Sequence, residues 1–426
     1  MKIENASVKI GGCDVLSLSQ KHGTPLYIMD VETIKSTVSA YKKLHSIYPN
    51  SRVAYASKAL SLTALYQLLD KEDLFFDVVS DGEFYSLLNA GISPDKAYFH
   101  GNNKSDVEIE FALKKKIGCI VVDNKDELRR IDRIYKDNKL NHTVRILLRV
   151  IPEIEAHTHE FIQTGQRDTK FGVLQEDLLD VIEYAVSLSY IEFGGIHAHI
   201  GSQIFDVEPY RFLLEKFMSI VKKVQDELGI TMDEISLGGG IGIQYIVEDD
   251  PPSIDDFIEI IANAIKETID KADSDLRPRI TIEPGRSIVA NAGVTTYTVG
   301  AVKPIPDKRT YVSVNGGMAD NPRPITYGAD YSADIVNKID RKKDQLYTIA
   351  GKFCESGDIL IKDIKLPKTE SGDTLMVYGT GAYNYSMASN YNRYRKPAMI
   401  FVEDGNDNLV LKRESLDDII RNDVKL

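Results

Sequence analysis

The feature that most constrains the fold is a regular alternation of strand-like and helix-like stretches between residues 53 and 285. Stretches such as SDVEIEFALKKK, KDELRRIDRIYKD and EPYRFLLEKFMSIVKKVQDEL carry apolar residues at helical spacing, and short apolar runs lie between them. Strands that alternate with helices predict βαβ units and parallel strand pairing.

Eight strand-like runs occur in this region, namely VAYA from Val53, FFDVV, AYFHG, CIVVD, VRILLRV, FGGIHAHIG, EISLGGG and ITIEPG. Eight such units within roughly 250 residues match the size of a closed barrel of parallel strands. The sequence therefore predicts an α/β fold built on a TIM-like (β/α)8 barrel.

Beyond Arg286 the pattern changes to short, β-branched segments that turns separate, such as VTTYTVGAVKPI, RTYVSVNGG, DTLMVYGTGAY and KPAMIFVE. These segments predict a mainly antiparallel β domain at the C-terminal side. Residues before about Asp30, including PLYIMD, also read as extended, and we expect this first strand to join the same domain. The predicted domains are a barrel over residues 35–284 and a β domain formed by residues 1–34 and 285–426.

The composition excludes several classes of protein. A chain of 426 residues is too long for one ordinary core, and 43% hydrophobic with 27% charged residues is typical of a soluble globular protein. A formal charge of −12 disfavours a nucleic-acid surface, and no segment has the apolar length needed to span a bilayer. The start, MKIENASVKIGG, lacks the features of a secretory signal. Three scattered cysteines, of which Cys119 in IGCIVVD is expected in the core, fit a reducing cytoplasm.

Residues of unusual type stand where four of the predicted barrel strands end. Lys58 follows the first strand, His199 with GSQ ends the sixth, Gly238-Gly239-Gly240 follows the seventh and Glu283 with PGR ends the eighth. Catalytic groups in barrels of this kind lie on the loops at the carboxyl ends of the strands. We therefore expect these four groups to face the same end of the barrel.

Lys58 and the three glycines together indicate a site for pyridoxal 5′-phosphate (PLP). The glycines leave backbone N–H groups able to approach a phosphate, although SLGGGIG also suits a plain turn before a helix. Lys58 suits a Schiff base, because the amine of a lysine in a partly buried site is made nucleophilic, although the roles of phosphate ligand and solvated loop residue stay open. PLP would supply both an aldehyde and a phosphate, and Glu283 would face its pyridine nitrogen.

His197 and His199 lie two residues apart, so both side chains point to one face of a strand. A metal pair is conceivable, but no convincing third ligand motif accompanies the two histidines, and we predict no metal site. A flat imidazole stacked on a pyridine ring suits His199, whereas His197 fits a packed neighbour.

Three segments of the later domain carry side chains of chemical interest. Arg323 and Tyr327, in GGMADNPRPITYGA, form a donor pair suited to a carboxylate. Cys354 and Glu355, in KFCESGDIL, offer an acid and a partner for an amine, and Tyr383, in TGAYNYSMASNYN, offers a hydroxyl to a phosphate or a substrate. Structural roles stay open for each, since a free cysteine is often a small buried apolar residue and a tyrosine a domain-interface residue.

These motifs resemble those of the PLP-dependent decarboxylases of the alanine-racemase-type fold. The resemblance rests on AYASKA, DVVSDGE, HGNNKS, THEFIQTGQRDTKFG, HAHIGSQI, LGGGIG, EPGRSIVANAG, GGMADNPRP, CESGD and GAYNYSMASNYN, which cover nearly the whole chain in the order of the family. It implies decarboxylation of an amino acid. The combination of Arg323, Tyr327 and Glu355 favours a diamino diacid over ornithine or arginine, because a buried arginine repels an ammonium tail.

The resemblance implies roles for single residues. Lys58 would hold the cofactor covalently, and Cys354 would return a proton after carbon dioxide leaves. Glu283 would face the pyridine nitrogen, and His199 would lie against the ring. The implied cofactor-binding residues are Lys58, His199, Ser202, Gly238, Gly239, Gly240, Glu283, Pro284, Gly285, Arg286 and Tyr383. The implied substrate-binding residues are Arg286, Arg323, Tyr327, Glu355 and Tyr383.

The resemblance also implies a homodimer, in which Cys354 and Glu355 reach the active site of the neighbouring subunit. Three positions depart from the family: Leu60 follows the lysine where asparagine is frequent, Asp81 replaces a glycine, and Asn315 replaces an aspartate. We expect the change at Asn315 to remove a charge near the segment that carries the substrate arginine.

Three other functions stay open. Another basic amino-acid or polyamine-pathway decarboxylase would share the fold and the mechanism. A non-catalytic PLP-binding protein of the same barrel type would lack the long second domain, so the segments CESGD and GAY count against it. A phosphosugar-binding barrel enzyme would use Lys58 without a cofactor.

Overall fold

The computed structural model describes residues 2–4, 6–152, 169–272 and 276–426. The chain divides into two compact units, one of residues 37–242 and 252–285 and one of residues 1–36, 243–251 and 286–426. We call the first the barrel unit and the second the β unit, and describe each by itself. Most of the motif THEFIQTGQRDTKFG, up to residue 168, lies outside the described residues.

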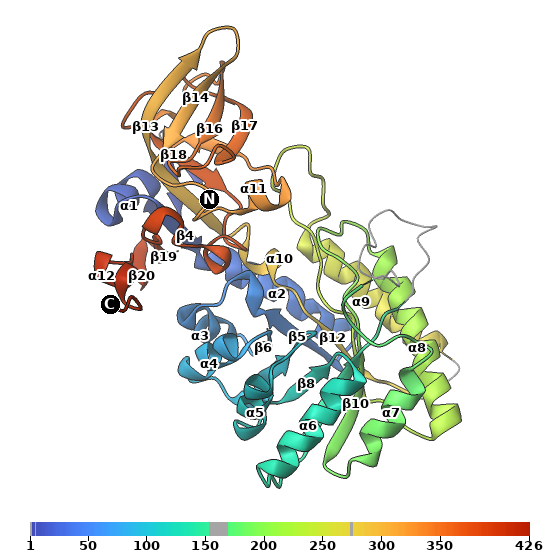
Figure 1. The fold of residues 1–426 in the computed structure, drawn as a ribbon. Coiled ribbons are helices and arrows are strands. Elements are labelled where there is room, and N and C mark those ends of the chain that lie inside the picture. Colours follow the sequence, from blue (N-terminus) through green and yellow to red (C-terminus); the bar gives the residue numbers. More distant parts are fainter. Residues whose placement is uncertain (1, 5, 153–168, 273–275) are drawn as a thin grey trace. The chain divides into compact units, whose positions relative to one another are not determined.

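Eight parallel strands close the barrel, and each pairs with the next strand along the chain (Figure 1). Pairing of the last strand with the first completes the ring, so the predicted (β/α)8 barrel is confirmed. The strands are β5 (Ser51–Ala56), β6 (Phe75–Val78), β7 (Ala97–Phe99), β8 (Cys119–Val122), β9 (Val144–Arg149), β10 (Ile191–His197), β11 (Glu234–Ser236) and β12 (Arg279–Ile282).

The short apolar runs predict strands whose side chains are buried, and the barrel strands have this property. Every residue of β8 is buried, which suits a strand covered on both faces. Cys119, with 2% of its surface exposed, packs with Tyr98, Val121 and Leu147 in one buried cluster. The expectation that Cys119 is a core residue is confirmed.

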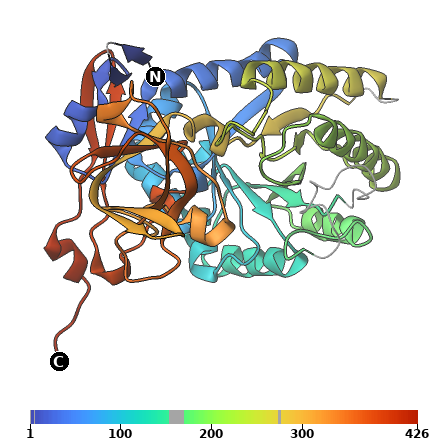
Figure 2. The same cartoon turned by 90° about the horizontal axis from the view of Figure 1, so that it is seen from above.

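Helices follow the barrel strands and cover their outer side (Figure 1). Figure 2 shows two of them, α2 and α9, side by side, and an ion pair of 2.8 Å joins Lys43 to Asp255 there. The helices are α2 (Val31–Ile47), α3 (Thr63–Lys71), α4 (Asp81–Asn89), α5 (Asp106–Lys114), α6 (Lys125–Asp137), α7 (Leu178–Ser187), α8 (Glu208–Leu228) and α9 (Ile254–Lys271). Two short 3₁₀ helices, η1 (Ser57–Ala59) and η2 (Pro94–Lys96), precede α3 and β7.

Local sequence fixes where these helices begin. Ser105 and Glu108 form a reciprocal capping box at the start of α5, and Asn124 caps α6 by accepting a hydrogen bond from the Glu127 N–H. Such caps satisfy backbone N–H groups that have no partner in the first turn. Helix α6 covers the same residues as the predicted stretch KDELRRIDRIYKD.

The β unit is built around one long strand, β13 (Gly293–Ile305). Its first half pairs antiparallel with β4 (Leu26–Asp30) and β18 (Thr374–Tyr378), and its second half with β14 (Arg309–Val314). Strand β4, from the early part of the chain, therefore pairs with a strand of the later part. The same sheet contains β15 (Ala333–Ile335), β16 (Gln345–Ala350), β17 (Ile359–Leu366), β19 (Ala398–Glu403) and β20 (Asn406–Leu411).

Two further groups of elements complete the β unit. The strands β1 (Lys2–Glu4), β2 (Ser7–Ile10) and β3 (Cys13–Asp14) form a small antiparallel sheet. The helices are α1 (Val15–His22), α10 (Arg286–Val289), α11 (Arg323–Tyr327), α12 (Leu416–Ile420), η3 (Val336–Lys338), η4 (Tyr385–Met387) and η5 (Tyr391–Arg393). None of the described helices is both long and apolar enough to cross a membrane.

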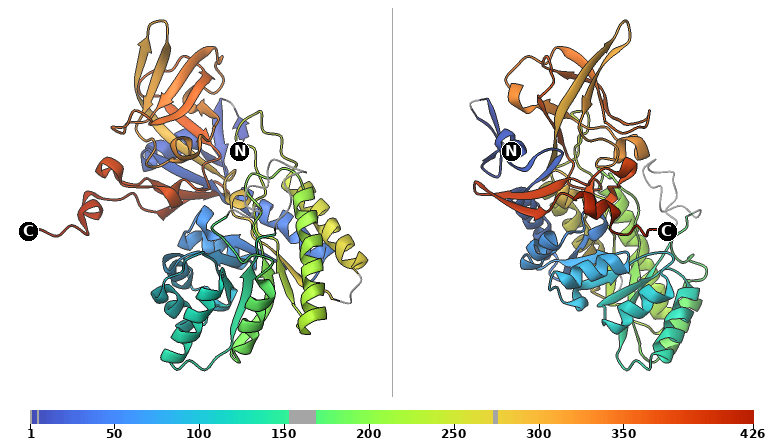
Figure 3. Two further views of the ribbon diagram at one scale, coloured as in Figure 1. Left: turned by 45° about the vertical axis from the view of Figure 1, so that its right-hand side comes forward. Right: turned by 60° about the vertical axis from the view of Figure 1, so that its left-hand side comes forward.

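Segments from the two ends of the chain pack together within the β unit. Figure 3 shows the blue N-terminal strands beside the red hairpin formed by β19 and β20. The N–H of Gly405 donates to the carbonyl oxygen of Gly11 at 2.7 Å, and Val8, Ile400 and Val402 share one hydrophobic cluster. This packing ties the first residues of the chain to its last strands.

Candidate active site

Lys58 lies just past the carboxyl end of β5. The strand ends at Ala56, and the short helix η1 buries Ser57 and Ala59 while it leaves the Lys58 side chain exposed. This exposure differs from the partly buried position that we expected. Burial raises the pKa of Asp77 and of Glu83, and the charge of Lys58 opposes both shifts, so its ammonium lies near these two carboxyl groups.

Glu283 follows β12 and has 5% of its surface exposed. Its Oε1 accepts a hydrogen bond from the Ser236 hydroxyl at 2.7 Å, and its Oε2 lies 3.1 Å from Nε2 of His197. Burial alone would raise the pKa of Glu283, but His197, His100 and Ser236 more than offset it, so the pKa lies below its ordinary value. The structure therefore holds an ionised carboxylate at a buried position.

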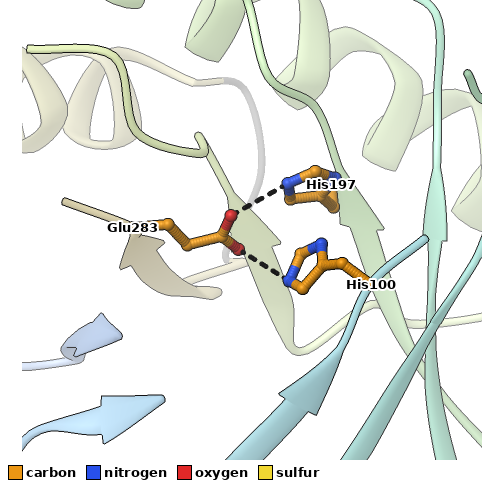
Figure 4. A group of neighbouring side chains, drawn as sticks. All are labelled: His100, His197 and Glu283. Atoms are coloured by element: carbon orange, nitrogen blue, oxygen red, sulfur yellow. Dashed lines mark hydrogen bonds and ion pairs between the residues drawn. The ribbon is translucent and has the colours of Figure 1, made fainter. Parts of the chain in front are cut away.

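Five side chains form the group that we call the glutamate cluster: Asp77, His100, His197, Ser236 and Glu283. Figure 4 shows the two imidazoles directed at the two oxygens of the carboxylate. His197, which we expected to be only a packed neighbour, contacts Glu283. Asp77, His100 and Ser236 were not among the predicted site residues, although a polar residue at the end of a buried strand is a signal that the sequence contains.

The three glycines follow β11 and pack tightly against neighbouring strand ends. A Cβ atom on Gly238, Gly239 or Gly240 would lie within 2.5 Å of a backbone carbonyl oxygen, so no other residue fits without movement. Tyr210 donates from its hydroxyl to the Gly239 carbonyl at 3.0 Å, and the Gly238 carbonyl accepts from the Glu283 N–H at 2.9 Å. Glycine at these three positions therefore lets the strand ends pack closely beside Glu283.

The loop after β12 also touches the strand that precedes Lys58. The N–H of Ala56 donates to the Pro284 carbonyl at 3.0 Å, and a Cβ atom on Gly285 would lie 3.0 Å from the Ala56 side chain. Because this approach needs a residue without a side chain, Gly285 positions the loop next to Lys58.

Three more residues lie on loops or strand ends at the carboxyl side of the barrel. His199 is half-buried, and burial together with the charges of Lys58 and Arg149 lowers its pKa well below the ordinary value, so its ring is neutral. Ser202 is exposed on the loop after β10. Arg149, at the end of β9, lies 4.1 Å from the centre of the Phe171 ring. Sequence reasoning missed Arg149, because VRILLRV reads as a plain strand.

In the β unit, two arginines share a group of tyrosines that we call the arginine–tyrosine cluster. Arg286 donates to the Tyr245 hydroxyl at 2.7 Å, and its guanidinium carbon lies 4.7 Å from the centre of the Tyr383 ring. Arg323 donates to the Tyr331 hydroxyl at 2.7 Å and lies 4.5 Å from the Tyr245 ring. Two guanidinium groups held in this way are suited to a carboxylate.

Arg323 donates to Tyr331, a tyrosine that was not among the predicted site residues. Tyr327, at the end of α11, has 65% of its surface exposed, whereas Tyr331 is buried and accepts the hydrogen bond from Arg323. Tyr383 is half-buried with φ +59, a strained conformation for a bulky residue that is frequent at functional sites.

Cys354 and Glu355 lie on an exposed loop of the β unit. The buried Asp358 anchors this loop, because its carboxylate accepts hydrogen bonds from the Phe353 N–H at 2.9 Å and the Met318 N–H at 2.7 Å. The aspartate of the CESGD motif therefore shapes the loop, and the cysteine and the glutamate are the residues that it presents.

Two of the three departures from the family have a structural explanation. The Asn315 amide donates to the Thr24 carbonyl at 3.1 Å and hydroxyl at 2.8 Å and accepts from the Thr298 N–H at 2.9 Å, which a carboxylate could not reproduce. Asp81 is exposed in the first turn of α4, where the helix dipole favours a negative charge. Leu60 is buried with 1% exposed.

Comparisons with known proteins agree over nearly the whole chain. Residues 32–290 match the family model described as the pyridoxal-binding domain of pyridoxal-dependent decarboxylases. The diaminopimelate decarboxylase of Bacillus subtilis (strain 168) is 45% identical over 424 residues, which is 99% of this chain and 96% of that protein. The diaminopimelate decarboxylase of Staphylococcus aureus (strain COL) is 43% identical, with 99% of each chain covered.

Solved structures give the same result. The diaminopimelate decarboxylase of M. jannaschii in co-complex with L-lysine superposes with a TM-score of 0.93 at 33% identity, over 100% of this chain and 98% of that one. The enzyme of Helicobacter pylori complexed with L-lysine gives a TM-score of 0.85 at 34% identity, over 95% of this chain and 98% of that one.

The barrel unit fits the cofactor of these relatives, pyridoxal phosphate. The unit contains an amine at Lys58, a buried carboxylate at Glu283 and an imidazole at His199, which are groups of the kinds that this cofactor requires. With PLP as its cofactor and relatives of one kind along its whole length, the chain belongs to the diaminopimelate decarboxylase family of pyridoxal-dependent decarboxylases.

Proposed function

We propose that this protein converts meso-2,6-diaminopimelate to L-lysine and carbon dioxide, the last step of lysine biosynthesis. The membership of the family supports a carboxy-lyase that uses PLP. The observation that carries the choice of substrate is the arginine–tyrosine cluster. Its two guanidinium groups suit a distal carboxylate, whereas ornithine and arginine end in a cation that they would repel.

The reacting end of the substrate is assigned to the barrel unit. Lys58 holds the cofactor through its amine, Glu283 faces the pyridine nitrogen and His199 lies against the ring. The loops hold the phosphate and the rest of the cofactor through Ser202, Gly238, Gly239, Gly240, Pro284, Gly285, Arg286 and Tyr383. The buried, ionised state of Glu283 supports this assignment, because such a carboxylate keeps a pyridine nitrogen protonated.

The distal end of the substrate is assigned to residues of the β unit. Arg286, Arg323 and Tyr327 bind the distal carboxylate, Glu355 binds the distal ammonium, and Tyr383 contacts substrate and phosphate. The pairing of Arg286 and Arg323 around Tyr245 supports the first part of this assignment.

When bound, pyridoxal phosphate supplies the electron sink that accepts the bonding electrons as carbon dioxide leaves Cα. The protein orients the bond between Cα and the carboxylate and keeps water away from it. Cys354 then delivers a proton to Cα from one face, so the lost carboxylate is replaced by hydrogen. General acid catalysis of this kind contributes about 10²–10⁴-fold to a rate.

We propose further that the enzyme is a cytoplasmic homodimer in which Cys354 and Glu355 complete the active site of the partner subunit. The exposure of both side chains within the single chain supports the shared site. All three cysteines are free, which suits a reducing compartment.

Product analysis tests the function. The purified holoenzyme is incubated with meso-diaminopimelate, ornithine, arginine, lysine and a carboxylated polyamine, and amines and carbon dioxide are measured. We expect equimolar lysine and carbon dioxide from diaminopimelate alone. Consumption of ornithine, arginine or the polyamine with diaminopimelate untouched would show that the substrate is wrong while the chemistry holds.

Replacement of the proposed proton donor tests the mechanism. We expect Cys354→Ala to keep the absorption band of the bound cofactor and to lower kcat by about 100-fold, the scale of one lost general acid. Cys13→Ala, in the hydrophobic core of the same unit, is the matched control and should keep kcat. A Cys354→Ala enzyme with full kcat would show that another group delivers the proton.

A further inference from the structure

His100 occupies a buried position between two carboxyl groups. The side chains of His100, Asp77 and Glu283 are 6%, 5% and 5% exposed. The Nε2 atom of His100 lies 3.5 Å from Oε1 of Glu283 and 3.7 Å from Oδ1 of Asp77. Figure 4 shows its ring directed at one oxygen of Glu283, with the ring of His197 directed at the other. One nitrogen atom therefore faces two acidic side chains from different strands of the barrel.

The proton on this nitrogen decides whether the arrangement is attractive. Within the described residues, neither Nε2 of His100 nor Oδ1 of Asp77 has a hydrogen-bond partner, and both atoms are buried. A lone pair on Nε2 would face an oxygen of the ionised Glu283, and this contact would be repulsive. A proton on Nε2 makes the contacts with both carboxyl groups attractive.

The surroundings of His100 favour a neutral ring. The charged and titratable groups that face it are Asp77 on β6, Glu283 after β12, His197 on β10, Arg149 on β9 and Lys104 after β7. Burial lowers the pKa of His100 well below its ordinary value, although the charge of Glu283 opposes this shift. A neutral imidazole carries one N–H, so the geometry selects the tautomer with the proton on Nε2.

We propose that His100 is a positioning residue that donates its Nε2 proton toward Glu283 and so keeps this carboxylate ionised and directed at the cofactor's ring nitrogen. It also separates Glu283 from Asp77, the second buried carboxyl group of the cluster. The inference rests on the proposed function, since it needs Glu283 to face the ring nitrogen. His100 acts through Glu283 and touches neither substrate nor cofactor in this role.

A bound metal ion is the competing explanation for the same side chains. One potential ligand atom from each of His100, His197 and Glu283 lies within 4.8 Å of the others. The hydrogen bond that the Ser236 hydroxyl donates to Oε1 of Glu283 is compatible with both explanations, because carboxylates that bind a metal ion are also hydrogen-bonded by neighbouring donors. The test below therefore includes Zn²⁺.

The test compares three variants of the holoenzyme. His100→Leu removes the donor and keeps an apolar side chain, His100→Gln keeps a neutral N–H donor, and His45→Gln, exposed on α2 in the same unit, is the control. The readouts are the pH midpoint at which the ring nitrogen of ¹⁵N-labelled cofactor loses its proton, the affinity for PLP, and kcat and KM. Histidine ¹⁵N NMR of the wild-type holoenzyme identifies the tautomer of His100.

We expect His100→Leu to lower the midpoint of the ring nitrogen by about one pH unit, because Glu283 loses a donor to its charged form. We expect kcat to fall about tenfold, which corresponds to one pKa unit, with KM nearly unchanged. His100→Gln should restore most of the midpoint and of kcat, and His45→Gln should match the wild type. The NMR signal of His100 should show its proton on Nε2.

Three results would overturn the role of His100 while the proposed function stands. They are a midpoint in His100→Leu equal to that of His45→Gln, a His100 proton on Nδ1, and stoichiometric binding of Zn²⁺ that His100→Leu abolishes. If His100→Leu does not fold, the tautomer of His100 in the wild type and the pH midpoint of the ring nitrogen in His100→Gln still test the proposal. A wild-type protein that forms no covalent adduct with PLP would instead refute the proposed function.

Discussion

Two buried glutamates stand at opposite ends of the same barrel and have partners of different chemistry. Glu283, at the carboxyl end of the strands, is held by Ser236 and by two imidazoles. Glu234, the first residue of β11 at the amino end, is fully buried and lies 3.0 Å from Arg145 and 3.3 Å from Arg279.

At the amino end of the barrel, the buried charged groups are paired with one another. The Tyr98 and Thr281 hydroxyls donate to Oε1 of Glu234 at 2.7 and 2.6 Å, so both oxygens of the carboxylate are used. Arg145 also pairs with Asp233 at 2.6 Å. A cavity of about 360 Å³ lies beside these groups, but the charges that line it already neutralise one another. We conclude that this end serves stability.

Both carboxylates are buried, so what distinguishes Glu234 from Glu283 is the kind of side chain that each contacts. A guanidinium stays charged at every physiological pH, so Glu234 is fixed by permanent cations. An imidazole is a weaker and titratable partner, so Glu283 keeps the capacity to face a further proton-bearing group. A buried carboxylate therefore indicates a functional site only when its partners leave it able to interact with a further group.

The largest expected effect distinguishes Lys58, just past the carboxyl end of β5, from Arg52, near the amino end of the same strand. Lys58→Ala should abolish both the cofactor's absorption band and decarboxylation, because no other amine takes its place, while the free energy of unfolding of the apoprotein stays close to the wild type. Arg52→Ala, at the amino end of β5, should keep the band and lose about 1–2 kcal/mol of stability, since Arg52 stacks 3.6 Å from the Phe75 ring.

Spectroscopy and urea unfolding measure these two outcomes on the same samples. A Lys58→Ala protein that retains a covalent adduct would remove the basis of the proposed chemistry. An Arg52→Ala protein that loses the adduct would show that the two ends of the barrel are not separate in function.

The next largest effect concerns the functional glutamate. Glu283→Gln keeps the size of the side chain but not its charge, and we expect kcat to fall about 10²–10³-fold, as for the loss of one preorganised electrostatic partner. Steady-state kinetics measure this loss, and urea unfolding should show a smaller change in stability than Glu234→Gln. Near wild-type kcat in Glu283→Gln would mean that the carboxylate does not act on the ring.

The fold could be read from the sequence because periodicity is a local property. All eight barrel strands overlap the predicted runs, although β5, β10 and β12 begin one or two residues earlier. Helices α6 and α8 match predicted stretches end to end. The small sheet of β1, β2 and β3 was read only as extended chain. The parallel pairing of β4 with β19 joins distant segments, and no local pattern reports it.

The site was predictable only where chemistry forms a short motif. Lys58, Glu283 and the three glycines stand in such motifs. His100 opens the motif HGNNKS and Tyr331 stands outside the quoted motifs, but the contacts of both depend on partners that folding brings close. Tyr327 was predicted together with Arg323 as a donor pair, and α11 leaves its ring exposed.

The structural glutamate gives the third prediction. Glu234→Gln leaves Arg145 and Arg279 without their buried counter-charge, and we expect the free energy of unfolding to fall by about 3 kcal/mol, the low end for a broken buried ion pair. The kcat of the folded enzyme should not change. Urea unfolding measures the stability, and steady-state kinetics normalised by active-site titration measure kcat. A Glu234→Gln protein with lowered kcat and wild-type stability would show that the amino end of the barrel serves catalysis and not stability.

The smallest effect is a difference in pH dependence between the two ends. His100 and His199 have pKa values well below the ordinary 6.5, mainly because burial disfavours the charged ring. Below pH 6.5 the unfolded chain binds protons that the folded chain does not, so the free energy of unfolding falls as the pH falls. The arginines of the amino end do not titrate in this range and add nothing to the slope.

His100→Gln should therefore make the stability of the enzyme less sensitive to acid, by at most about 1.4 kcal/mol per pH unit for one proton. Urea midpoints at several pH values between 7.5 and 5.5 measure the slope, with His45→Gln as the control that should keep it. If His100→Gln keeps the wild-type slope, the folded protein takes up the same proton. Burial at the carboxyl end would then not keep the ring of His100 neutral in the folded protein.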